Sequence, residues 1–139
     1  MKIEQLLLFF MIGLILLSCG DGNKGNEQDV VEEKKAEVIA IHDEVMPKMG
    51  QLKSYQNQLS AEAEGMEAQA AEAFIQAARK CEEAYEGMFV WMRQFDASLE
   101  GMSEEESVAY LEEQREKVVV VNEDIKKALS EAELLLEEK

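Results

Sequence analysis

The chain is poor in the residues that most often carry out chemistry. Its 139 residues include one histidine, one proline, one tryptophan and two cysteines. A catalytic triad needs a basic partner for its nucleophile, and no serine or cysteine motif accompanies His42, the single histidine. A glycine-rich phosphate loop is absent, and Ile39 stands where the Glu-x-x-His motif of ferritin-like proteins needs a glutamate. We therefore predict a protein that is not an enzyme and needs no cofactor.

Positive charge is also scarce. The chain has 14 Lys and Arg residues against 30 Asp and Glu residues, which gives a formal net charge of −16. Such an excess of negative charge repels phosphates, so we predict no nucleic-acid partner and no direct binding of anionic lipid headgroups. The acidic residues are expected to form a solvated surface.

No apolar run is long enough to span a bilayer. The longest, Leu6 to Leu17, has 12 residues, well below the ~20 that a spanning helix needs. Its length matches the core of a secretion signal. The end of the run and the two residues after it, Leu16-Leu17-Ser18-Cys19, resemble the lipobox of bacterial lipoproteins, although Leu17 is bulkier than the small residue usual there. The alternative is an ordinary signal peptide with an incidental cysteine, but no other small-residue cleavage site follows the run.

The lipobox resemblance implies a modified and anchored N-terminus. In that family the signal is cut before the cysteine, whose sulfur is lipidated and whose new amino group is acylated. Several acyl chains, such as palmitate, hold a protein stably on a membrane, whereas one does so only marginally. We expect a signal peptide over residues 1–18, the lipidated Cys19 and a flexible linker over 19–29, and a folded domain over 30–139. This predicts a cell-envelope location on the inner or outer membrane, and it leaves Cys81 without a disulfide partner.

The rest of the chain has the composition and periodicity of helices. A first heptad stripe has companions at Ile41 and Tyr55 and consists of Val31, Val38, Val45, Leu52 and Leu59. A second stripe steps by three or four residues through Phe74, Ala78, Cys81, Tyr85, Met88, Met92 and Phe95. The third comprises Val108, Leu111, Val118, Ile125, Leu129, Ala132 and Leu136.

Candidate caps divide these stripes into separate helices. Ser60 is the predicted N-cap of the second helix, with Glu62 and Glu64 near the positive end of its dipole. The segment DASLEGMS, residues 96–103, is the next break. It is followed by a capping box in which Ser103 and Glu106 each satisfy an exposed backbone amide of the other.

Three amphipathic helices with short connections predict an all-α fold, an antiparallel up-down-up three-helix bundle packed like a coiled coil. The run Val118 to Val121 is assigned to helix, because an isolated strand has no partner. Arg115 and Asn122 interrupt the third stripe and are interpreted as polar residues that fix the register of the seam. Regular heptads also build intermolecular coiled coils, so self-association is an alternative to a monomeric bundle.

The stretch IHDEVMPKMG, residues 41–50, contains the single histidine and the single proline. His42, Met46 and Met49 fall on one side of a helix, and histidine with thioether ligands suits copper. Further ligands would have to come from Met66, Met88, Met92 or Cys81. Methionines on a helical stripe more often fill a core, so we predict core packing, with a kink at Pro47 that Gly50 eases.

The stretches IHDEVMPKMGQLKSYQNQL and FVWMRQFD resemble a group of short Bacteroidota lipoproteins, often labelled "viral A-type inclusion protein". That label reflects coiled-coil similarity and not a viral role. The resemblance spans the signal, the linker and most of the first two helices. It implies a helical envelope lipoprotein and assigns no functional residues.

Two classes of function follow from these observations. The first is a non-enzymatic envelope lipoprotein, tethered by its lipid, whose helical surface has a structural role or binds another envelope protein. Trp91 is its candidate anchor residue, since aromatic side chains concentrate binding energy at interfaces; the alternative is a core tryptophan at the end of the bundle. The second class is a periplasmic copper binder centred on His42, Met46 and Met49. A methionine or cysteine of the second helix facing His42 would favour it.

Overall fold

The computed structural model describes the backbone of residues 24–137 and the side chains of residues 28–137. It contains α2 (Lys24–Val45), the 3-10 turn η1 (Met46–Lys48), α3 (Met49–Glu64), α4 (Ala68–Gln94) and α5 (Glu104–Glu137). The predicted signal peptide, Cys19 and the first residues of the linker lie outside the described residues. α2 begins at Lys24, inside the segment predicted as linker.

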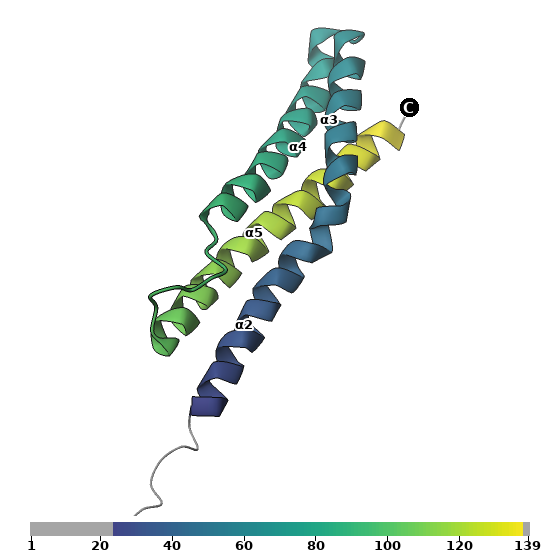
Figure 1. The fold of residues 1–139 in the computed structure, drawn as a ribbon. Coiled ribbons are helices and arrows are strands. Elements are labelled where there is room, and N and C mark those ends of the chain that lie inside the picture. The colour runs from purple at the N-terminus through teal and green to yellow at the C-terminus, as the bar shows by residue number, and fades with distance from the viewer. Residues whose placement is uncertain (1–23, 138–139) are drawn as a thin grey trace, which may run out of the picture.

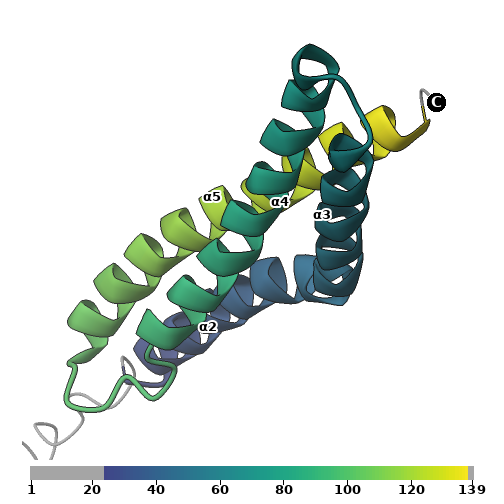
Figure 2. The same cartoon turned by 90° about the horizontal axis from the view of Figure 1, so that it is seen from above.

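Within residues 24–137 every regular element is a helix and there is no strand, and the run Val118 to Val121 lies in α5 as predicted. Figures 1 and 2 show α3 packed along α4, and α2 packed along α5. The order of the paired residues along the chain shows how the helices run relative to one another. On α2, Lys34 pairs with Glu112 of α5 at 2.8 Å, and Glu44 pairs with Lys126 at 2.6 Å. Residue numbers therefore increase in the same direction along both helices, so α2 and α5 are parallel.

The helices α4 and α5 are antiparallel. Lys80 pairs with Glu131 at 2.6 Å near one end, and the Asp96 amide donates to the Tyr110 hydroxyl at 2.7 Å near the other. The prediction of an all-α fold built from mutually packed helices is confirmed.

Pro47 interrupts the first helical arm, as predicted. Proline has no amide hydrogen, so the carbonyl four residues earlier loses its usual donor and the α-helix cannot continue regularly. The chain passes from α2 through η1, where the Met49 amide bonds to the Met46 carbonyl, and resumes as α3. Figure 2 shows α3 leaving the line of α2 at this point. The kink directs α3 toward α4 while α2 stays with α5.

The predicted start of the second helix at Ser60 is wrong. Ser60 lies inside α3, and its hydroxyl donates to the Gln56 carbonyl four residues earlier at 2.9 Å, a bond that lets serine occupy a helix interior. The turn falls later, at Gly65, and α4 begins at Ala68. Glu62 and Glu64 therefore sit at the C-terminal end of α3 and not at a helix N-terminus. Burial of Leu59 and the helix-forming alanines that follow it extend the helix past the serine.

The first stripe forms the core as predicted. Its five members are buried, with Val38, Val45, Leu52 and Leu59 fully inaccessible to solvent. From the third stripe five residues are buried, and Val108 and Leu136 pack against the core in partly buried positions.

The prediction that the second stripe faces the core is only partly correct. Ala78, Cys81 and Met88 are buried, and the aromatic members are partly buried against the core. Met92, predicted to face inward, is 38% exposed. It lies in the last turn of α4, which ends at Gln94. Figure 2 shows that α3 packs along the other end of α4, so less of the protein covers the helix here.

The connection from α4 to α5 is built from local hydrogen bonds. The Asp96 carboxylate accepts the Ser98 amide at 2.9 Å and the Ser98 hydroxyl at 2.7 Å, which forms an Asx turn. Leu99 and Gly101 have φ of 55° and 82°, the left-handed region in which glycine is favoured. The capping box then forms as predicted: the Ser103 amide donates to Glu106 at 2.8 Å, and the Glu106 amide donates to the Ser103 hydroxyl at 3.2 Å.

Candidate functional site

His42 lies in the last turn of α2, beside α4. Its Nδ1 is 2.8 Å from an Asp43 carboxylate oxygen, and its ring lies against the indole of Trp91, with centroids 5.8 Å apart and planes at 36°. His42 Nε2 and Trp91 Nε1 are both buried and have no hydrogen-bond partner among the side chains that the structure describes. The neighbour of the histidine on α4 is therefore an aromatic ring.

The methionines among the remaining copper candidates differ in their burial. Met49 is buried in the core and Met46 packs against it. Met88 is fully buried and Met92 is exposed.

Cys81 points toward α5. Its thiol is 3.8 Å from the Ala128 carbonyl, and burial, followed by the negative charge of Glu131, raises the pKa of the thiol to about 11. A thiol in that state is a poor ligand and a poor nucleophile at neutral pH. Residues 24–137 contain no group of three or more His, Cys, Asp and Glu side chains arranged to hold a metal ion.

Trp91 belongs to a row of aromatic rings that links α4 to α5. Its indole stacks on Phe95 with centroids 4.9 Å apart, and Phe95 stacks on Tyr110 at 6.3 Å. Trp91 is 5% exposed. The structure thus places the candidate anchor residue inside the protein, where it packs between helices.

The polar residues assigned to the third stripe occupy two different environments. Asn122 is buried, and its amide nitrogen donates to the Ile41 carbonyl at 2.8 Å and to a Glu44 carboxylate oxygen at 3.0 Å. The placement of Arg115 in the seam is wrong: its side chain lies at the surface and pairs with Glu37 at 2.6 Å. Gln114, which lies outside the predicted stripe, is the buried residue at this level. The straight α-helix drifts relative to a strict seven-residue repeat, and this moves the inward position by one residue.

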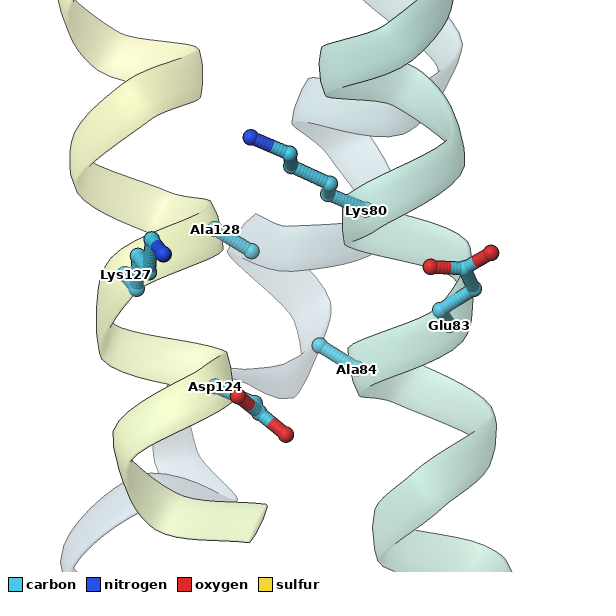
Figure 3. Close-up of a pocket in the computed structure, with 6 residues that line it drawn as sticks. All are labelled: Lys80, Glu83, Ala84, Asp124, Lys127 and Ala128. Carbon is cyan, nitrogen blue, oxygen red and sulfur yellow. The ribbon is translucent and has the colours of Figure 1, made fainter. Parts of the chain in front are cut away.

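A groove of about 260 Å³ runs between α4 and α5 on the side away from the core (Figure 3). Ala84 and Ala128 form its floor, because both are small and buried where the two helices approach. Four charged side chains rim it: Lys80 and Glu83 on α4, and Asp124 and Lys127 on α5. The apolar stripes in the sequence provided no signal for this groove, because its rim belongs to charged faces that were expected to be solvated surface.

No known family, curated protein or solved structure matches this chain. Among the helices that the structure describes, none combines the length and apolarity required to cross a bilayer.

Proposed function

We propose that this chain is a lipid-anchored envelope protein whose helical domain acts by protein contact and not by catalysis. The observation that carries the proposal is the sequence Leu16-Leu17-Ser18-Cys19 at the end of a 12-residue apolar run. Such a run is too short to remain as a spanning helix and has the length of a cleaved signal core. Acylation of Cys19 then holds the domain at the surface of the inner or outer membrane.

The domain itself is proposed to be an up-down-up three-helix bundle, in which α2 and α3 form the first arm. Its interior is filled by aliphatic and aromatic side chains, and its titratable groups form exposed ion pairs between helices. Exposed pairs of this kind contribute little stability and leave the charge on the surface. A rigid acidic rod on a short tether supports a structural or scaffolding role, with a second envelope protein as its partner.

Inhibition of lipoprotein signal cleavage tests the anchor. Globomycin, which blocks that cleavage, is expected to cause a larger precursor to accumulate. Cys19→Ala is expected to abolish lipidation and to release or mislocalise the protein. Cys81→Ala is the matched control, because it removes the other cysteine and leaves the N-terminus unchanged. Unchanged processing and membrane retention in both the globomycin and the Cys19→Ala experiments would refute the lipoprotein assignment.

Cross-linking in the native cell, followed by mass spectrometry, tests the partner. A specific envelope protein linked through exposed lysines of the helical domain is the expected result. Loss of that link in Cys19→Ala would show that the tether positions the contact. If the chain is processed and anchored but links to no envelope protein, the interaction role fails while the anchor stands.

A further inference from the structure

Two contacts between α4 and α5 show which of their residues lie at the same level. They are Lys80 with Glu131 at 2.6 Å, and the Cys81 thiol with the Ala128 carbonyl at 3.8 Å. Because the helices are antiparallel, residue numbers that rise along α4 match residue numbers that fall along α5. Glu83 therefore lies level with Lys127. Figure 3 shows these two side chains at about the same height, on opposite sides of the groove.

A row of residues seven positions apart passes through this level on each helix. The rows are Gln76, Glu83 and Val90 on α4, and Leu134, Lys127 and Val120 on α5. In this order each member of one row lies level with its counterpart in the other, and residues seven apart fall on nearly the same side of a helix. Val120 and Leu134 are each 57% exposed and Val90 is 41% exposed. The groove side of α4 and α5 thus carries apolar side chains that the helices of this domain leave uncovered.

The charged members of the two rows are accessible to an outside partner. Lys127 is exposed, and within residues 28–137 it forms no ion pair. Glu83 pairs with Arg79 at 3.2 Å on the surface, a kind of pair that contributes little stability. Gly87 lies on the same side of α4, between Glu83 and Val90, and a Cβ atom there would meet nothing within 4 Å. A partner can therefore approach α4 closely on this side.

We propose that this face binds a second copy of the chain, related by a two-fold axis that runs along the groove. Each α4 then packs on α5 of the other copy, and because the contact is isologous every pair occurs twice. Glu83 of each copy meets Lys127 of the other, and Val90 meets Val120. The second copy supplies both the apolar side chains and the opposite charges that the exposed rows require.

The charges favour this axis over one that crosses the groove. A two-fold axis across the groove at the middle level would place α4 on α4 and α5 on α5. Lys127 would then face Lys127, and Glu83 would face Glu83, so that like charges oppose one another at both contacts. The axis along the groove replaces these two repulsions with two attractions.

The edge of the proposed interface holds two further pairs with opposing effects. Arg93 lies level with Glu116 of the other copy and attracts it, whereas Glu86 lies level with Glu123 and repels it. All four side chains are exposed, so water and salt screen both interactions. The opposite-charge pairs at the middle of the interface therefore decide the arrangement.

The same axis leaves both copies pointing in one direction. Rotation about an axis along the groove does not exchange the ends of the groove, and α2 runs parallel to α5 (Figure 1). Both copies of α2 therefore begin at the same end of the dimer, and an anchor at Cys19 would let both copies attach to one membrane. The dimer does not require the anchor, so the two proposals are tested separately.

Disulfide formation between two single variants of the full-length chain tests the geometry. Val90→Cys and Val120→Cys are mixed in mild detergent under gentle oxidation, and a tag on one of them separates the products by size. A disulfide needs Cα atoms within about 7 Å of each other. We expect a linked dimer that contains both variants, and none from either variant alone, because neither α4 nor α5 faces its own counterpart. The unmodified chain controls for Cys19 and Cys81. Linking within one variant alone, or none in the mixture, would overturn the arrangement.

Charge variants test the interface itself, by sedimentation of the full-length protein in mild detergent at about 0.15 M salt. Lys127→Glu places like charges together at two symmetric positions, so we expect dimer affinity to fall on the order of tenfold or more. Glu83→Lys/Lys127→Glu restores opposite charges and is expected to restore the dimer. Lys53→Glu, an equal charge change on α3, is the control and is expected to leave the dimer intact. A monomeric wild-type chain, which would leave this face to a different protein, or a dimer that Lys127→Glu does not weaken, would contradict the proposal.

Discussion

The indole of Trp91 packs on the imidazole of His42, and each ring carries a buried nitrogen without a hydrogen-bond partner among the described side chains. The adjacent Asp43 carboxylate only accepts hydrogen bonds, so it favours the tautomer with the proton on His42 Nδ1. Nε2 is then an acceptor, and Trp91 Nε1 is a donor. The two orphan groups are thus complementary in type, and the rings connect α2 to α4 at the end of the domain where α3 is absent.

This packing predicts a large effect of Trp91 on stability. Trp91→Ala removes a buried ring that contacts both His42 and Phe95, and we expect the free energy of unfolding to fall by about 3–5 kcal/mol. Met92→Ala is the matched control. It truncates the neighbouring, exposed side chain and should cost less than about 1 kcal/mol. Urea denaturation of both variants measures the difference, and equal effects would show that Trp91 is not part of the core.

Substitutions of the buried Asn122 and the exposed Arg115 are also predicted to differ in their effect on stability. Asn122→Ala removes the side-chain amide that donates to the partly buried Ile41 carbonyl and to the Glu44 carboxylate, so we expect the free energy of unfolding to fall by about 1–3 kcal/mol. Arg115→Ala breaks a surface pair with Glu37, which is worth about 0–1 kcal/mol.

Titration of Glu44 gives a second readout. Its pKa is lowered first by the hydrogen bond from Lys126 and then by that from Asn122, so in Asn122→Ala the pKa should rise toward its ordinary value. NMR titration of the carboxyl measures this shift, and an unchanged pKa would contradict the Asn122 contact.

The Ser103–Glu106 capping box makes stability depend on pH. Hydrogen bonds from the backbone amide and side chain of Ser103 lower the pKa of Glu106 below its ordinary value of 4.5. A carboxyl with a lowered folded-state pKa stabilises the fold above its unfolded-state pKa, and this contribution is lost as pH falls through the folded-state value. Ser103→Ala should cost about 1 kcal/mol at neutral pH. Thermal unfolding at several pH values checks this. The difference in melting temperature between the wild type and Ser103→Ala should become smaller below about pH 4.5. A difference that does not change with pH would argue against the capping box.

The sequence predicted the parts of the fold that depend on local chemistry and strong periodicity. The heptad from Val31 to Leu59 requires one buried face, Pro47 cannot donate the bond that a straight helix needs, and Ser103 with Glu106 forms a cap without help from distant residues. Ser60 failed as a cap because a serine also fits inside a helix by bonding to the preceding turn. That choice depends on the burial of Leu59 against other helices.

The candidate sites depended on tertiary contacts that periodicity does not specify. The kink direction decides that Met92 is exposed, and helical drift over α5 decides that Gln114 and not Arg115 turns inward. The pairing of His42 with Trp91 joins residues on separate helices, and neither residue signals the other in the sequence.

Copper binding provides the test between the two classes of function. A ligand that binds only the folded state stabilises it by RT ln(1 + [L]/Kd), about 2.7 kcal/mol at a hundredfold excess over Kd. A copper site at His42, Met46 and Met49 would therefore raise the melting temperature at micromolar copper(I), and His42→Ala would abolish the rise. We expect no rise, because Met49 fills the core, the neighbour of His42 on α4 is Trp91, and the Cys81 thiol faces Ala128.

Met49→Ala controls for the structural role of the methionine in the same experiment. Truncation of this buried side chain should lower the free energy of unfolding by about 2–5 kcal/mol with or without copper. A contribution from metal ligation would instead make the cost larger when copper is present. A copper-dependent rise in the wild type that disappears in His42→Ala would favour the metal-binding function over the protein-contact function.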